Sequence, residues 1–245
     1  MKFDYKPLLD AGEGEPVILL HGLFGNLSNW GHVVDEFKTT HRVLIPRLPF
    51  YTRPITRQRL DDLVDYITDF VEENQLQKII LMGNSLGGHV ALLYAWKYPA
   101  LVRRLVLAGS SGLYENSFGG TFPRVKDYDY IREKVKSTFY KPEVATKELV
   151  DEVYDTVQSR VNTLSIIGLA RAAQRHNVAD MLGQLITPTL LVWGLQDTIT
   201  PPEVALEFYD RLPNAEIAFL DHCGHVPMME QPQLFNQHVR KFINK

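Results

Sequence analysis

Apolar residues along this chain form short continuous runs that alternate with longer amphipathic stretches. The short runs have the length of buried strands and lie at residues 17–21, 42–45, 78–82, 102–108, 189–193 and 216–220, with residues 3–9 as an early edge strand. Helical patterns follow Asn29 and cover residues 59–73, 88–98, 202–212 and 232–243. Strands that alternate with helices favour a sheet covered on both faces, so the predicted fold class is α/β, doubly wound and mostly parallel.

The run at residues 78–82 leads directly into Gly83-Asn84-Ser85-Leu86-Gly87, which has the G-x-S-x-G form of a nucleophile elbow. An apolar run of helix length follows and ends before Pro99. In this strand–turn–helix context the serine hydroxyl is held at the end of the sheet, and the two flanking glycines leave room for the tight crossing. Ser85 is therefore the candidate nucleophile.

A serine nucleophile needs a base, and the base needs an acid that orients it. Asp197 follows the strand pattern at residues 189–193 and His225 follows the pattern at 216–220, so both are expected at the carboxyl end of the sheet with Ser85. A metal site at His222, Cys223 and His225 is the competing interpretation, but the sequence offers no second cluster of ligands. We predict a catalytic triad of Ser85, Asp197 and His225, with no metal and no cofactor.

These motifs make the chain, from residue 16 to residue 242, resemble the α/β-hydrolase superfamily, in which serine, acid and histidine follow in this order. The strand and His21-Gly22-Leu23 that follows it are similar to the family segment that supplies half of the oxyanion hole. The resemblance implies that the backbone N–H groups of Leu23 and Leu86 bind the oxyanion.

A helical insertion interrupts the alternation between residues 108 and 189. Residues 109–120 are rich in glycine and serine, as in a hinge, and residues 127–185 have the spacing of three or four helices. We divide the chain into a core (1–110 and 187–245) and a helical cap (111–186), because related hydrolases carry a cap here. A helical decoration that does not touch the site is the alternative. The aromatic candidates for the lining of an apolar cavity are Phe118, Tyr128, Tyr130, Phe139, Tyr140 and Tyr154.

Two departures from the family pattern bear on the substrate. After the strand at residues 42–45, many relatives have D-x-R-G-H-G-x-S, whereas residues 46–54 read PRLPFYTRP. The elbow G-N-S-L-G-G resembles that of carbon–carbon bond hydrolases that cleave ring-fission dienoates. Those relatives usually have a tryptophan after the catalytic histidine and an Arg-Trp pair in a cap helix, where this chain has Val226 and Val153-Tyr154.

Composition limits the classes of partner. With 245 residues and 45% hydrophobic residues, the chain can bury one large core. A net charge of −3 gives no electrostatic basis for binding nucleic acid or an anionic membrane. No apolar run approaches the roughly 20 residues that span a bilayer, and the N-terminus lacks the apolar segment of a secretory signal. A single cysteine suits a reducing compartment, so we expect a cytoplasmic location.

The sequence therefore predicts a carboxylesterase-like serine hydrolase that cleaves a small to medium apolar ester through an acyl-enzyme on Ser85. A carbon–carbon bond hydrolase of the ring-fission-product type is one alternative. The other is a catalytically silent α/β-hydrolase that binds a small ligand or a partner protein, which is disfavoured because all three triad positions are kept. The expected partner is a small-molecule substrate, and the sequence leaves the oligomeric state open.

Overall fold

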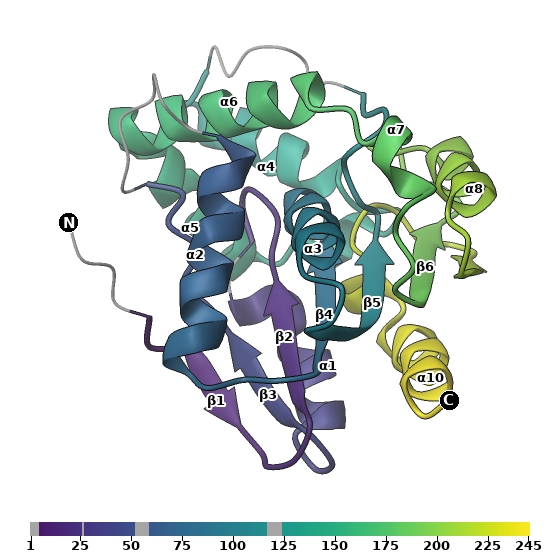
Figure 1. Cartoon of the computed structure of the whole chain (residues 1–245). Coiled ribbons are helices and arrows are strands. Elements are labelled where there is room, and N and C mark those ends of the chain that lie inside the picture. The colour runs from purple at the N-terminus through teal and green to yellow at the C-terminus, as the bar shows by residue number, and fades with distance from the viewer. Residues whose placement is uncertain (1–4, 26, 52–58, 117–123) are drawn as a thin grey trace.

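The computed structural model covers the whole chain and describes residues 5–25, 27–51, 59–116 and 124–245 (Figure 1). Within these ranges there are seven strands: β1 (Leu9–Ala11), β2 (Pro16–Leu20), β3 (Arg42–Ile45), β4 (Ile79–Asn84), β5 (Val102–Ala108), β6 (Thr189–Gly194) and β7 (Ala215–Leu220). They form one sheet in the order β1-β3-β2-β4-β5-β6-β7. All neighbours pair in parallel except β1 and β3, which pair antiparallel. The predicted mostly parallel α/β sheet is confirmed.

The edge strand lies later in the chain than the sequence pattern indicated. We expected it at residues 3–9, but β1 begins at Leu9 and pairs with β3 through Ala11, opposite Val43. Tyr5 instead lies beside α2 (Leu60–Glu73), where its hydroxyl donates to a carboxylate oxygen of Asp69 at 2.6 Å. Gly12, at a φ of +81°, turns the chain from β1 toward β2. Pairing with β3, rather than local pattern, sets the position of this short strand. Residues 1–4 lie outside the described part of the chain.

Helices cover both faces of the sheet because alternate strand residues point to opposite sides. Ile18 and Leu20 of β2 pack with α2 (Leu60–Glu73), α3 (Leu86–Lys97) and α8 (Pro202–Arg211). Val17 and Leu19 pack with α1 (Gly31–Phe37) and α10 (Pro232–Ile243) on the other face. The helices predicted in these regions are present, and the doubly wound arrangement is confirmed.

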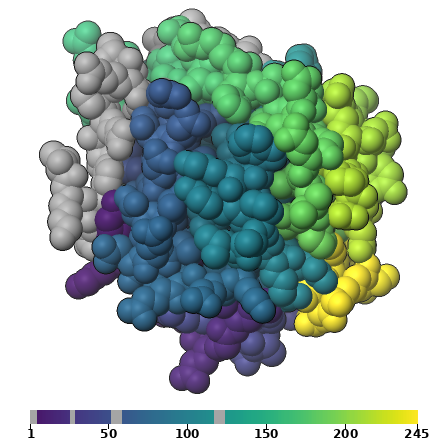
Figure 2. All heavy atoms as spheres, in the orientation of Figure 1, coloured from purple at the N-terminus to yellow at the C-terminus, as the bar shows by residue number. Residues whose placement is uncertain are grey.

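The insertion between β5 and β6 is helical. It contains α4 (Tyr128–Lys136), the 3₁₀ turn η3 (Pro142–Val144), α5 (Lys147–Gln158), α6 (Arg160–Arg175) and α7 (Ala179–Leu182). In Figure 1, α6 crosses the top of the molecule, the end toward which the arrow of β5 points. In the space-filling view, the green atoms of this region rest directly against the blue and teal atoms of α2 and α3 (Figure 2). These helices therefore cover the carboxyl end of the sheet.

Outside the insertion, two short elements were not predicted: the 3₁₀ turn η1 (Leu27–Trp30) and α9 (Pro227–Glu230). Each is four residues long, which is too short for a helical period to be visible in sequence. Within the described part of the chain, no helix has both the length and the hydropathy that crossing a bilayer requires. The boundaries that we assigned to the core and the cap stay a prediction.

Candidate active site

Ser85 occupies a strained turn between β4 and α3. Its φ is +55°, a region that side-chain-bearing residues rarely adopt. The turn is held from both sides: the Ser85 N–H donates to the Ala108 carbonyl at 3.2 Å, and the Ser85 carbonyl accepts from the amides of His89 at 3.1 Å and Ser111 at 3.2 Å. A Cβ on Gly83 would collide with the Gly87 carbonyl group. The strained turn is thus held by neighbouring backbone, and Ser85, directly before α3, is one of the residues that line the cavity described below.

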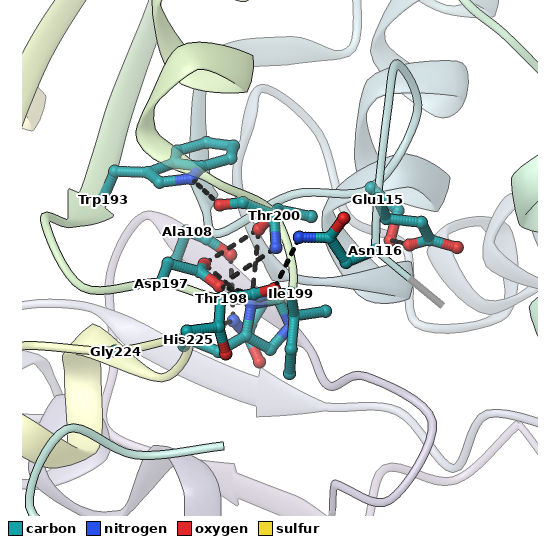
Figure 3. A network of polar contacts seen from close by, with 12 residues as sticks. Ala108, Glu115, Asn116, Trp193, Asp197, Thr198, Ile199, Thr200, Gly224 and His225 are labelled. Carbon is teal, nitrogen blue, oxygen red and sulfur yellow. Dashed lines mark hydrogen bonds and ion pairs between the residues drawn. The ribbon is translucent and has the colours of Figure 1, made fainter. Parts of the chain in front are cut away.

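His225 and Asp197 form a buried pair. Their side chains meet at 2.8 Å, from His225 Nδ1 to Asp197 Oδ2, and the residues are only 4% and 3% exposed. Asp197 Oδ2 also accepts from the Thr200 hydroxyl at 2.8 Å. Asp197 Oδ1 accepts from the amides of Ile199 at 2.8 Å and Thr200 at 3.0 Å. Figure 3 shows these groups converging on the carboxylate. Four donors fix its orientation, and because Nδ1 is engaged, Nε2 is the nitrogen that can take up a proton.

Asn84 joins the serine turn to the histidine loop. Its side-chain amide donates to the carbonyl of Ala108 at 2.9 Å and to the carbonyl of His225 at 3.0 Å. The residue before the candidate nucleophile therefore anchors the backbone of the candidate base. The sequence indicated Asn84 only as part of the elbow motif, since this contact spans 141 positions along the chain.

Ser85 and His225 line one cavity of about 300 Å³, together with Leu23 and Leu86. A Cβ on Gly22 would lie only 3.1 Å from the Ser85 Cβ, so the segment that carries Leu23 runs directly beside the serine. Leu86 is the first residue of α3, where a backbone N–H has no acceptor within its own helix. Four of the five predicted site residues thus face the same space, and Asp197 lies behind His225.

The far wall of the cavity comes from the insertion and is mostly apolar. It is lined by Ile131, Val135, Phe139, Leu149, Val153, Ile166, Ile167 and Ala170. Of the predicted aromatic lining residues, Phe139 is part of this wall and Phe118 lies outside the described residues. Tyr128, Tyr130, Tyr140 and Tyr154 do not belong to it. Tyr128 and Tyr154 instead pack ring against ring with 5.2 Å between centroids. Which face of each helix points inward depends on packing, which the sequence alone did not reveal.

Charged groups reach the cavity at a few points. Glu115 follows β5, and its Oε2 accepts a hydrogen bond of 2.6 Å from the Ser111 hydroxyl. Burial raises the pKa of the Glu115 carboxyl, against the opposing influence of Ser111 and His225. Lys134 and Arg171 line the cavity from α4 and α6. Glu115 therefore brings a carboxyl group close to the candidate base, a feature that no sequence motif indicated.

Three other histidines, His21, His89 and His222, make contacts that do not involve the triad. Burial lowers the pKa of His21, whose Nδ1 is 2.9 Å from the Gly22 carbonyl. Burial and the nearby His176 lower the pKa of His89 to about 3. His222 is exposed and its ring packs beside Tyr140, while Cys223 is buried. Among the described residues, no three histidine, cysteine or acidic side chains are grouped as a metal would require.

The segment at residues 46–54 is described only as far as residue 51. Phe50 is buried and packs edge-on against His21, with 5.2 Å between ring centroids. None of residues 46–51 lines the cavity. In its described part, this unusual segment supports the loop that carries Leu23 instead of shaping the pocket directly, and its last three residues lie outside the described part.

The fold and the arrangement of these residues are those of an α/β-hydrolase. Residues 17–238 match the model of the alpha/beta hydrolase family, which covers most of the chain. The chain therefore belongs to the alpha/beta hydrolase family, as its sequence motifs indicated, and is an enzyme of the hydrolase class.

Solved and characterised relatives extend this result. One solved relative is MGS-MChE2, an alpha/beta hydrolase enzyme from a sediment metagenome of the Mar Chica lagoon in Morocco. Its sequence is 38% identical to this chain, and the two structures superpose with a TM-score of 0.78. The match covers 96% of this chain and 93% of that one. A 2-hydroxy-6-oxononadienedioate/2-hydroxy-6-oxononatrienedioate hydrolase from Pseudomonas sp. is 27% identical over 96% of this chain and 90% of its own length. Lipase 3 from Moraxella sp. is 26% identical over 90% of this chain and 75% of its own length.

A longer relative shares the same region. The dihydrolipoyllysine-residue acetyltransferase component of an acetoin cleaving system from Pseudomonas putida is 29% identical over 96% of this chain, which spans 65% of that protein. Similar sequences thus occur in proteins with different activities. Family membership establishes the class of enzyme, and the substrate has to be argued from the site.

Proposed function

We propose that this chain is a serine hydrolase that cleaves small to medium apolar esters through an acyl-enzyme on Ser85. The observation that carries the proposal is that Ser85 and His225 face one mostly apolar cavity while Asp197 holds the imidazole from behind. This arrangement supports the roles of nucleophile for Ser85, base for His225 and orienting acid for Asp197. The helices of the proposed cap supply the apolar wall against which an acyl chain would lie.

The chemistry follows from the positions of these groups. Ser85 Oγ attacks the ester carbonyl while His225 Nε2 takes the hydroxyl proton, and Asp197 stabilises the imidazolium that forms. The amides of Leu23 and Leu86 hold the oxyanion of the tetrahedral intermediate. Collapse breaks the bond to the leaving alcohol, which receives the proton from His225. A water molecule then attacks the acyl-enzyme with His225 as base, and release of the carboxylic acid restores the Ser85 hydroxyl.

A carbon–carbon bond hydrolase is the second candidate. It is favoured by Asn84 within G-N-S-L-G-G and by the similarity to a hydrolase whose name specifies an oxo-dienedioate. Charge does not separate the two candidates: Glu115 would repel a substrate carboxylate at its end of the cavity, whereas Lys134 and Arg171 line the same cavity and would attract one. Val226 stands where relatives with that activity usually have a tryptophan, and the wall that the insertion supplies is mostly apolar. These two observations support an apolar ester over a dienoate.

A panel of p-nitrophenyl esters from acetate to octanoate tests the proposal. We expect turnover that falls by at least about a thousandfold in Ser85→Ala. Ser165→Ala is the matched control, because Ser165 is a buried serine of α6 whose hydroxyl has no hydrogen-bond partner among the described residues. Turnover of a ring-fission dienoate that exceeds ester turnover would favour the second candidate. Ester turnover that survives in Ser85→Ala would refute the serine mechanism, and no turnover of any substrate would favour a silent binding protein.

A further inference from the structure

Glu230 is a buried carboxylate close to the candidate base. It is the last residue of α9, five positions after His225, and is 6% exposed. Burying a carboxylate is unfavourable unless hydrogen bonds compensate for the lost water. Here burial raises the pKa of Glu230 even though three backbone amides act in the opposite direction. The hydrogen bonds of the Glu230 carboxylate therefore show which parts of the structure it stabilises.

The two oxygens of Glu230 bind two segments that are far apart in the sequence. Oε1 accepts the Gly224 N–H at 2.7 Å, directly before His225. Oε2 accepts the N–H groups of Tyr140 at 2.7 Å and Lys141 at 3.2 Å, in the link that follows α4. One side chain therefore ties the histidine loop of the sheet domain to the helical insertion.

Two further observations place these segments in direct contact. The His225 N–H donates to the Thr138 carbonyl at 3.0 Å, which is also in the link after α4. A Cβ on Gly224 would lie 2.8 Å from the Thr138 oxygen and 2.9 Å from the Tyr140 nitrogen, so only glycine allows this approach. The backbone of His225 is thus held on one side by the insertion and on the other by Asn84, whose side chain donates to the His225 carbonyl.

We propose that Glu230 is a positioning residue that locks the His225 loop to the end of α4, so that the location of the insertion sets the location of the imidazole. The inference rests on the proposed function, in which His225 is the base. Proton transfer and nucleophilic attack depend steeply on geometry, and a displacement of about 1 Å can cost about a hundredfold in rate. The insertion therefore acts on the chemical step as well as on the size of the pocket.

A positioning role and a purely structural role differ in their kinetic consequences. If Glu230 aligns His225, its loss slows the chemical step for every substrate, including an acetate ester too short to fill the pocket. If Glu230 only supports the pocket wall, its loss raises KM for octanoate and leaves acetate turnover unchanged. The ratio of the two effects separates the roles.

Glu230→Gln is the principal variant, because it keeps the size of the side chain but places an NH₂ group against at least one backbone N–H donor. We expect kcat to fall about ten- to a hundredfold on both the acetate and the octanoate ester, with KM changed less than about threefold. Glu207→Gln is the matched control: Glu207 is an exposed glutamate of α8 that pairs with Arg211 at the surface, and its replacement should leave kcat unchanged. Full acetate turnover in folded Glu230→Gln would overturn the inference.

A second variant keeps the test decisive if Glu230→Gln does not fold. Glu230→Asp keeps the carboxylate but shortens the side chain by one methylene, so a single group can no longer reach both the Gly224 amide and the amides of Tyr140 and Lys141. We expect a loss of kcat of at least about threefold on both esters, because one of the two segments is released. An effect confined to octanoate would contradict the inference. A failure of the proposed function is recognised separately, by turnover that persists in Ser85→Ala.

Discussion

Thr200 offers a single-bond test of how the Asp197 carboxylate is held. Its hydroxyl donates to Asp197 Oδ2 at 2.8 Å and lies 3.3 Å from His225 Nδ1. Thr200→Val replaces this hydroxyl by a methyl group of the same shape. The backbone contacts of Thr200 remain, with its N–H on Asp197 Oδ1 and its carbonyl accepting from the Trp193 indole at 2.8 Å. The substitution thus removes one hydrogen bond to a buried charge and little else.

The expected magnitude follows from that bond. A hydrogen bond to a charged group contributes about 1.5–3 kcal/mol, so Thr200→Val should lower the free energy of unfolding by about that amount. If the whole loss were felt in the transition state, kcat/KM would fall by about ten- to a hundredfold. Asp197 keeps three other donors, namely His225 Nδ1 and the amides of Ile199 and Thr200, so we expect a loss of about tenfold.

Urea unfolding followed by tryptophan fluorescence, together with kcat/KM on p-nitrophenyl butyrate, measures both effects. The matched control is Thr187→Val, since Thr187 is 3% exposed and its hydroxyl has no hydrogen-bond partner among the described residues. Replacing an unpartnered buried hydroxyl should be neutral or slightly stabilising. If Thr187→Val lost as much stability as Thr200→Val, the loss would come from the exchange of side chains and the reasoning from the Asp197 bond would be refuted.

Three other outcomes are expected. His225→Ala should lower kcat by at least about a thousandfold, and combining it with Ser85→Ala should add little in steady-state assays, because the residues act as a unit; additive losses would contradict this. Glu115→Gln should narrow the preference for a butyrate ester over an anionic hemisuccinate ester, measured as a ratio of kcat/KM, whereas an unchanged ratio would mean that the carboxylate does not face the substrate. His89 has a pKa of about 3 in the folded protein against 6.5 as its ordinary value, so the unfolded chain binds more protons in this range and stability falls as pH drops below about 6.5. Urea midpoints at pH 7 and pH 4.5 should therefore differ less in His89→Leu than in the unaltered protein, and equal differences would exclude this contribution.

The sequence predicted the sheet, and the three residues of the proposed triad could be chosen from it, because both depend on local pattern. Ser85, Asp197 and His225 each follow a continuous apolar run, and the ends of parallel strands meet at one edge of a sheet. The elbow could be recognised because its glycines, its serine and the apolar helix that follows are adjacent in the chain. Signals of this kind need no knowledge of tertiary structure.

The supporting contacts could not be predicted because they join distant backbone segments. Glu230 meets Tyr140 across 90 positions, and Asn84 meets His225 across 141. Neither contact leaves a periodic trace in the sequence. The sequence also did not show which faces of α4 and α5 line the pocket. Tyr128 and Tyr154 are aromatic residues of the kind that line apolar pockets, but their rings pack against each other. Side-chain direction on an inserted helix is set by its neighbours rather than by its own pattern.

The insertion connects β5 and β6, two strands that pair directly, and this placement allows its length to vary. β5 and β6 pair directly, with Ala108 opposite Val192, although about 80 residues of chain separate the two strands. The entropy of closing such a loop grows only with the logarithm of its length, so doubling the insertion would cost the β5–β6 pairing only about 0.6 kcal/mol. The sheet therefore tolerates lengthening of this segment by whole helices at little thermodynamic expense. The segment after α4 limits how the insertion can be lengthened, because the amides of Tyr140 and Lys141 have to stay within hydrogen-bond distance of Glu230.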